Sequence, residues 1–105
     1  MTRLIVNSGG CGYTVIIAVE KDETARKRYT LAVVTECKHV NLLAKDLPTL
    51  NMADALTPIL ANPVYQAAAR RVKHAACPVP SGILKALEVE AGLNVPRDVT
   101  MVFEK

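Results

Sequence analysis

The chain has 105 residues, of which half are hydrophobic and 22% are charged, and this composition excludes an intrinsically disordered protein. The length suits one domain, spanning residues 1–105, that can bury a core without disulfide bonds. The formal net charge of +3 comes largely from two basic clusters, residues 26–28 and 70–73. Neither cluster is interleaved with aromatic side chains, so binding to nucleic acid is not favoured.

Three β-strands are predicted in the first third of the chain. Residues 3–7 read RLIVN, a short strand that ends at a serine and two glycines. Residues 12–20 and 29–36 are rich in β-branched side chains and are bounded by glycine or by charged residues. The polar stretch between these two longer strands predicts an antiparallel hairpin with a long loop.

Helices are predicted over the middle of the chain. Residues 37–47 carry apolar side chains at a mixed helical spacing. A short second helix is predicted from Asn51, which suits an N-cap, and Pro58 interrupts it. A third helix is predicted over residues 63–76, because a capping Asn62 is followed by proline at the first helical position.

The last helix has the clearest pattern, because apolar side chains between residues 83 and 91 fall on one face. Gly92 suits a left-handed C-cap. Residues 98–105 alternate in polarity and predict a closing strand. The resulting order, β-β-β-α-α-α-α-β, predicts an α+β two-layer sandwich, with a mostly antiparallel sheet of about four strands and the helices on one face.

The cysteine content and the absence of targeting signals bear on the compartment. Arg3 is followed by only three consecutive apolar residues, too few for a signal peptide. No apolar run approaches the roughly 20 residues of a membrane helix. Three cysteines are an odd number for a disulfide framework. We therefore expect a cytoplasmic protein with no membrane partner.

Cys11, Cys37 and Cys77 are the main candidates for a functional site. If the loop of the predicted hairpin is symmetric, Glu20 faces Tyr29, and Cys11 and Cys37 become near neighbours at the open end of the hairpin. A one-residue slip of register would reverse which face each side chain occupies. Sequence alone therefore leaves the sharing of a face undecided.

The local settings of the cysteines suit thiolate chemistry. Cys37 and Cys77 open predicted helices, where unsatisfied N–H groups and the helix dipole should lower the pKa of a thiol. The glycines beside Cys11 would let backbone amides approach an anion or a cofactor closely. Two glycines and two histidines complete the set of candidate residues: Gly10, Gly12, His39 and His74.

Three interpretations of this set remain open. In the leading one, which is not enzymatic, Cys11, Cys37 and Cys77 bind zinc or an iron–sulfur cluster, with His39 and His74 as further candidate ligands. In the second, Cys77 alone performs carrier or catalytic chemistry. In the third, the cysteines are buried and inert, and the protein is an interaction module that forms a homodimer through a sheet edge or through the helix of residues 63–76.

The segment CPVPSGILKAL, residues 77–87, resembles the Cys-Pro-x-Pro helix start of the TusA-like sulfur-carrier family. In that family the cysteine carries a persulfide and hands sulfur to partner proteins, on a small α/β sandwich. The resemblance places Cys77 at the carrier cysteine, with Pro78 and Pro80 at the two prolines. The family has this motif after its first strand, whereas here it follows several helices, so the resemblance is local.

Most of the chain resembles an uncharacterised family of small proteins from anaerobic bacteria and archaea. The segments that carry the resemblance are GCGY, TECKHVNLLAKDL and CPVPSGILKALEVEAGLNVP. This resemblance implies no established activity. It does imply a role in an anaerobic cytoplasm, where thiolate clusters and reactive sulfur are both chemically stable.

Overall fold

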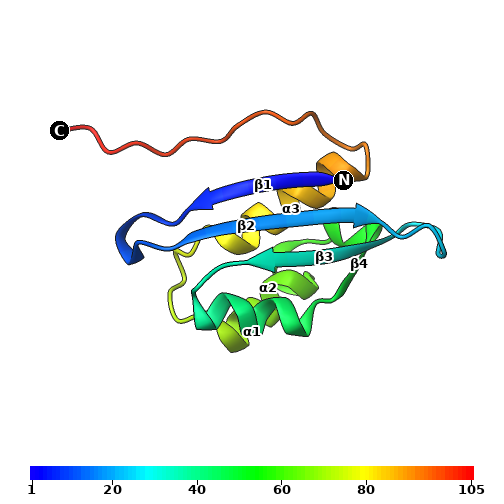
Figure 1. The fold of residues 1–105 in the computed structure, drawn as a ribbon, viewed down its shortest axis with the longest axis horizontal. Coiled ribbons are helices and arrows are strands. Elements are labelled where there is room, and N and C mark those ends of the chain that lie inside the picture. Colours follow the sequence, from blue (N-terminus) through cyan, green and yellow to red (C-terminus); the bar gives the residue numbers. More distant parts are fainter.

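The structure is a computed structural model that describes residues 1–105, and it has the predicted α+β architecture with a sheet and helices in two layers (Figure 1). The strands are β1 (Thr2–Asn7), β2 (Thr14–Lys21), β3 (Arg28–Val34) and β4 (Thr49–Asn51). The α-helices are α1 (Lys38–Asp46), α2 (Pro63–Arg71) and α3 (Val79–Glu90). Three short 3-10 turns are η1 (Gly9–Cys11), η2 (Met52–Ala55) and η3 (Ile59–Ala61).

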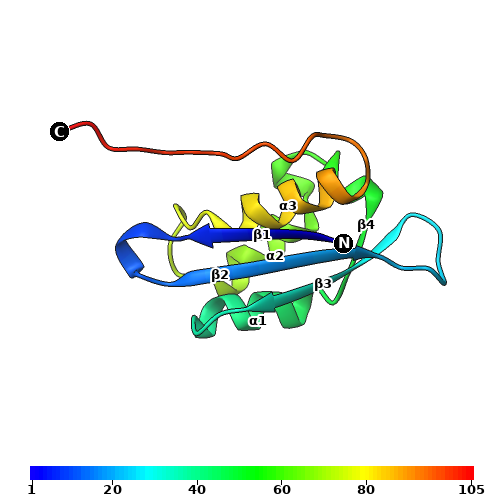
Figure 2. The ribbon, with the colours of Figure 1, turned by 45° about the horizontal axis from the view of Figure 1, so that its top comes forward.

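The four strands form one antiparallel sheet in the order β1-β2-β3-β4. One face of the sheet packs against the helices, and α3 lies across β1 and β2 while α1 lies beside β3 (Figures 1 and 2). The alternation along β2 shows the reason, because every second side chain is fully buried. The buried side chains of β2 are Val15, Ile17 and Val19. The prediction that the helices cover one face is confirmed.

The core is aliphatic except for the buried Tyr29, in keeping with a chain that has only one Phe, three Tyr and no Trp. Its largest fully buried side chains include Leu43 of α1, Leu50 of β4, and Ile83 and Leu87 of α3. Gly82 brings α3 close to the sheet, because a Cβ at this position would lie 3.0 Å from Val6 Cγ2. The first turn of α3 is thus held tightly against the end of β1.

The register between β2 and β3 differs by one residue from the prediction. Glu20 pairs with Thr30 rather than with its predicted partner. The loop is not symmetric, because the Asp22 carboxylate accepts hydrogen bonds from the N–H and the hydroxyl of Thr24, at 2.9 and 2.6 Å. Lys27 also adopts a left-handed conformation with φ of 58°. These local hydrogen bonds and this turn determine the pairing.

The helices of the middle segment are shorter than predicted. The region after Asn51 contains 3-10 turns in place of an α-helix, although its capping box is present, with Asp54 accepting from the Asn51 N–H at 2.8 Å. The helix predicted over residues 63–76 ends at Arg71. The three-residue strand β4 was not predicted, because so short a segment has no periodicity to detect.

The predicted closing strand, residues 98–105, is wrong for this structure. These residues follow the left-handed Gly92 (φ 76°) and run as an extended segment without strand pairing. Figures 1 and 2 show this segment on the β1 side of the sheet, directed the same way as β1. None of the helices combines the length and the apolar character that crossing a bilayer requires.

Candidate functional site

The three cysteines lie at one end of the molecule, which we call the thiol end. Cys11 belongs to the turn between β1 and β2, Cys37 precedes α1, and Cys77 precedes α3. Figures 1 and 2 show the turn and the starts of both helices gathered at the left of the molecule. The antiparallel sheet explains the position of Cys11 and Cys37, because the β1–β2 turn and the end of β3 lie at the same end of the strands.

Cys11 is the exposed member of the set. It ends η1, and the following Gly12 is left-handed with φ of 80°, so its N–H can bond to the Gly9 carbonyl at 2.8 Å. A Cβ added at Gly9, Gly10 or Gly12 would meet no atom within 4 Å. The turn therefore stands in solvent and holds the Cys11 thiol without packing around it.

Cys37 is half-buried and is the N-cap of α1, as predicted. Its backbone N–H donates to Thr35 Oγ1 at 3.2 Å, and the Thr35 hydroxyl donates to the Thr14 carbonyl at 3.0 Å. The same threonine therefore ties the start of α1 to the start of β2. The Cys37 side chain makes no capping hydrogen bond, which leaves its sulfur available.

Cys77 is half-buried and lies just before α3, whose N-cap is Pro78. Burial raises the pKa of the Cys77 thiol, and the N–H of Val79 opposes this by lowering it. The prediction that the helix start lowers the pKa of Cys77 is therefore wrong. Desolvation outweighs the helix terminus because the sulfur packs against the hydrophobic core.

The other two cysteines influence Cys77 electrostatically. Negative charge on Cys37, and to a smaller extent on Cys11, raises the pKa of Cys77 further. Interaction of this kind requires that the groups lie near each other. The folded chain thus brings together residues that are 66 positions apart in sequence, although no group of three His, Cys, Asp or Glu side chains is spaced to hold a metal ion directly.

The remaining candidate residues are distributed around this end. His39 lies in the first turn of α1, half-buried, beside the basic C-terminal turn of α2. His74 is exposed in the segment between α2 and α3, because α2 ends before it, and so it is not in a last helical turn as predicted. Gly10 and Gly12 flank Cys11 in the exposed turn.

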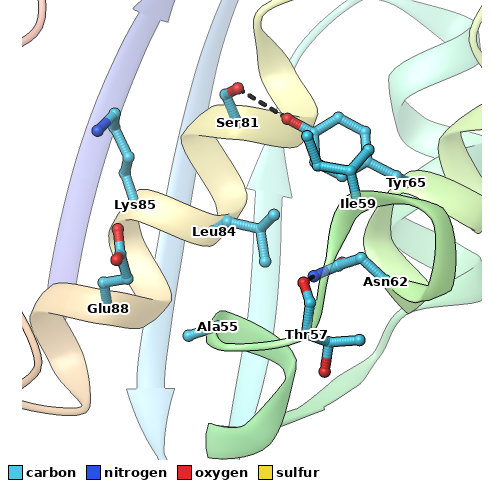
Figure 3. A pocket seen from close by; sticks show the side chains of 9 residues that line it. All are labelled: Ala55, Thr57, Ile59, Asn62, Tyr65, Ser81, Leu84, Lys85 and Glu88. Carbon is cyan, nitrogen blue, oxygen red and sulfur yellow. Dashed lines mark hydrogen bonds between the residues drawn. The ribbon is translucent and has the colours of Figure 1, made fainter.

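A second feature, a cleft of about 270 Å³, was not predicted from the sequence. It lies between α3 and the segment that contains η2, η3 and the start of α2 (Figure 3). The hydroxyls of Tyr65 and Ser81 are 2.9 Å apart at its upper rim, and Lys85 and Glu88 project from α3 on one side. Tyr65 and Ser81 are sixteen residues apart, and no local pattern pointed to their contact.

The buried polar groups on the interior side of this cleft already have hydrogen-bond partners within the protein. The buried Asn62 donates through Nδ2 to the carbonyls of Asp54 and Thr57, at 2.7 and 3.0 Å, and accepts from the Val64 N–H at 3.0 Å. No buried side-chain nitrogen or oxygen in the structure lacks a hydrogen-bond partner. The cleft therefore presents no unpaired buried polar group to a ligand, and the thiol end is the stronger candidate.

Comparison with protein families adds one finding. Residues 2–103 match the model of a family of unknown function, DUF6951. The chain belongs to this family. The prediction of an uncharacterised family is confirmed, while the anaerobic origin and the local likeness to sulfur carriers remain predictions. No curated protein and no solved structure matches the chain.

Proposed function

We propose that the thiol end is a thiolate site that binds a soft metal ion or an iron–sulfur cluster through Cys11, Cys37 and Cys77. The supporting observation is that the turn with Cys11 and the starts of α1 and α3, which carry Cys37 and Cys77, lie at one end (Figure 1), where negative charge on Cys37 and Cys11 raises the pKa of Cys77. A bound cation reverses this repulsion, because each thiolate then faces a positive charge. Thiolates are the ligands preferred by zinc and by iron–sulfur clusters.

The arrangement also indicates how the ligands would close around the metal. Cys37 and Cys77 are anchored at the starts of two helices that pack on the sheet. Cys11 is carried by the glycine-rich turn that meets no packed neighbours. The turn can therefore bring the Cys11 sulfur to the other two without disrupting the core, and binding supplies the free energy for this movement.

The protonation states make binding dependent on pH. The raised pKa of Cys77 keeps this thiol protonated at neutral pH, so metal binding must release its proton. Metal affinity is therefore expected to increase as the pH rises from 6 to 8. A site that used only carboxylates or neutral imidazoles would change much less over the upper part of this range.

The decisive experiment is metal analysis together with an absorption spectrum on protein purified without oxygen. We expect zinc, or iron with sulfide, at close to stoichiometric amounts, and we expect Cys77→Ser, Cys37→Ser and Cys11→Ser each to lower the metal content several-fold. Glu23→Gln, in the exposed loop at the opposite end, is the matched control and should retain the metal.

Two results would contradict the proposal. One is a metal-free wild-type protein that does not bind added Zn²⁺, or reconstituted iron and sulfide, under reducing conditions. The other is binding that survives all three cysteine substitutions. Circular dichroism of each variant separates loss of a ligand from loss of the fold.

A second candidate function is sulfur transfer through Cys77. It is favoured by the N–H of Val79, which acts at the start of α3 to stabilise a negative charge on the sulfur. Alkylation rates measured against pH test it. Fast labelling of Cys77 near neutral pH, with Cys11 slow, would support this function, whereas the half-buried Cys77 and the exposed Cys11 of the structure predict the reverse order.

A further inference from the structure

The C-terminal segment, residues 93–105, exposes more apolar side chains than any other part of the chain. Met101, Val102 and Phe103 are 83%, 85% and 98% exposed. The segment has the alternating pattern of a strand, yet no backbone hydrogen bond joins it to β1. The family model extends through Phe103, so residues 93–103 of this segment belong to the part of the chain that the family shares.

The free edge of β1 offers the backbone groups that such a strand requires. The Ser8 N–H donates to the Tyr13 carbonyl at 3.0 Å, which continues the β1–β2 ladder beyond Asn7. Hydrogen-bonded and non-bonded pairs alternate in an antiparallel ladder. The backbone N–H and C=O groups of the even-numbered residues of β1 therefore point toward β2. The N–H and C=O groups of Arg3, Ile5 and Asn7 therefore point away from the sheet, and exposed edges of this kind are templates for another strand.

We propose that the C-terminal segment of one copy of this chain pairs with β1 of a second copy, antiparallel, and that the exchange is reciprocal in a two-fold symmetric homodimer. Antiparallel pairing places three residues of the segment opposite the three free edge residues in one register. The resulting pairs are Arg3 with Glu104, Ile5 with Val102, and Asn7 with Thr100.

This register matches both faces of the sheet. On the outer face it joins a positive charge to a negative one and an aliphatic side chain to another. On the helix-covered face it sets Phe103 and Met101 beside Leu4 and Val6, which are only partly buried at the edge of the core. Pro96 lies outside the paired residues, so every required backbone N–H is present.

The direction of the chain identifies a second copy as the occupant. The segment runs in the same direction as β1 of its own chain (Figures 1 and 2), so pairing within one chain would be parallel. A parallel register that sets Ile5 beside Val102 sets Arg3 beside Thr100 and leaves the charge pair unmade. A two-fold axis reverses the partner's segment and produces the antiparallel register.

Sedimentation equilibrium on the full chain, with charge-reversed variants, tests the proposal. The wild type is expected to dimerise, and Arg3→Glu or Glu104→Arg alone should raise the dimer dissociation constant about tenfold, because like charges then face each other at two junctions. Mixing the two variants should restore an affinity within about threefold of the wild type, since the heterodimer contains one reversed and one original charge pair. Asp98→Arg, outside the paired residues, is the matched control.

A second variant tests the backbone pairing itself. Val102→Pro removes an N–H that the register requires and should raise the dissociation constant at least about tenfold, while Asp98→Pro should not. A protein that stays monomeric at every concentration overturns the proposal. So does a dimer that is unaffected by Val102→Pro, or a mixture of the two charge variants that associates no better than each alone. Asp98 and Val102 are both exposed, and circular dichroism checks that each proline variant still folds as a monomer.

Discussion

The two ends of the molecule differ in whether their polar side chains have partners within the protein. At the end opposite the thiols, Glu90 accepts hydrogen bonds from the Thr2 hydroxyl at 2.7 Å and from the Lys21 N–H at 3.2 Å, and Asp22 pairs with Arg28 at 3.1 Å. At the thiol end, the Cys37 side chain makes no capping bond, Cys11 stands in solvent, and burial raises the pKa of Cys77. The carboxylates at one end are paired within the chain, whereas the exposed Cys11 and the half-buried Cys37 at the other end are free thiols.

This difference indicates which end of the molecule can bind a ligand. Paired carboxylates stabilise the fold and have little left for a ligand. The free thiols of Cys11 and Cys37 take part in no ion pair of the fold, and a metal ion or a sulfur atom can bind to them without breaking one. The following predictions test this contrast, from the largest expected effect to the smallest.

The largest effect is expected for Ile83→Ala. Ile83 is fully buried in the helix that connects the two ends, directly after Gly82, where α3 touches β1 and β2. Removing three methyl or methylene groups leaves a cavity, and the free energy of unfolding should fall by about 2–5 kcal/mol. Urea denaturation measures this change. The exposed Lys85→Ala, on the same helix, is the control and should change stability by less than about 0.5 kcal/mol.

A smaller effect is expected for Asn62→Ala at the start of α2. Asn62 is 2% exposed, caps α2, and supplies two further hydrogen bonds to the carbonyls of Asp54 and Thr57. Its loss leaves buried backbone groups unpaired and should lower the free energy of unfolding by about 1–3 kcal/mol.

The readout for Asn62→Ala also separates the two ends. Metal binding and thiol labelling at the thiol end should be unchanged at temperatures where the variant remains folded. A loss of metal binding that accompanies the loss of stability would show that the start of α2 and the thiol end are coupled, and it would contradict their independence.

The smallest effect concerns the pH dependence of Glu90→Gln. Burial alone would raise the pKa of Glu90, but the hydrogen bonds from Thr2 and Lys21 and the charge of the N-terminus outweigh it and hold the pKa below its ordinary value. A carboxyl group with a lowered pKa stabilises the fold at neutral pH, and this contribution is lost as the pH falls through the folded pKa.

The wild type should therefore lose more stability than Glu90→Gln between neutral pH and the acidic range below the ordinary pKa of glutamate. Thermal unfolding followed at a series of pH values measures the difference. Parallel pH profiles for the two proteins would show that Glu90 does not contribute in this way.

Much of the fold could be predicted from local pattern. The buried alternation of β2, the apolar face of α3, Asn62 with Pro63 at the start of α2, and the left-handed Gly92 each act over a few neighbouring residues. The placement of Cys11 and Cys37 at one end of the sheet could be predicted, because an antiparallel hairpin brings its open end near the residue that follows it, while their role in a site stays a prediction.

Other features depended on contacts that no local pattern contains. The β2–β3 register follows from the side-chain hydrogen bonds of Asp22 and the left-handed Lys27 in the loop. The pKa of Cys77 follows from packing against the core, which outweighs the helix start that the sequence indicated. The cleft beside Tyr65 and Ser81 arises only where α2 and α3 meet.

By itself, the sequence determined the first three strands, the helices α1, α2 and α3, and the identity of the three thiols, because propensity, hydrophobic period and turn chemistry act between neighbours. Only the tertiary structure decided the one-residue register, the burial that raises the pKa of Cys77, and the unpaired C-terminal segment. The physical reason is that solvation and strand pairing depend on what surrounds a residue in space. An alternating segment such as residues 98–105 becomes a strand only where a free edge is available to receive it.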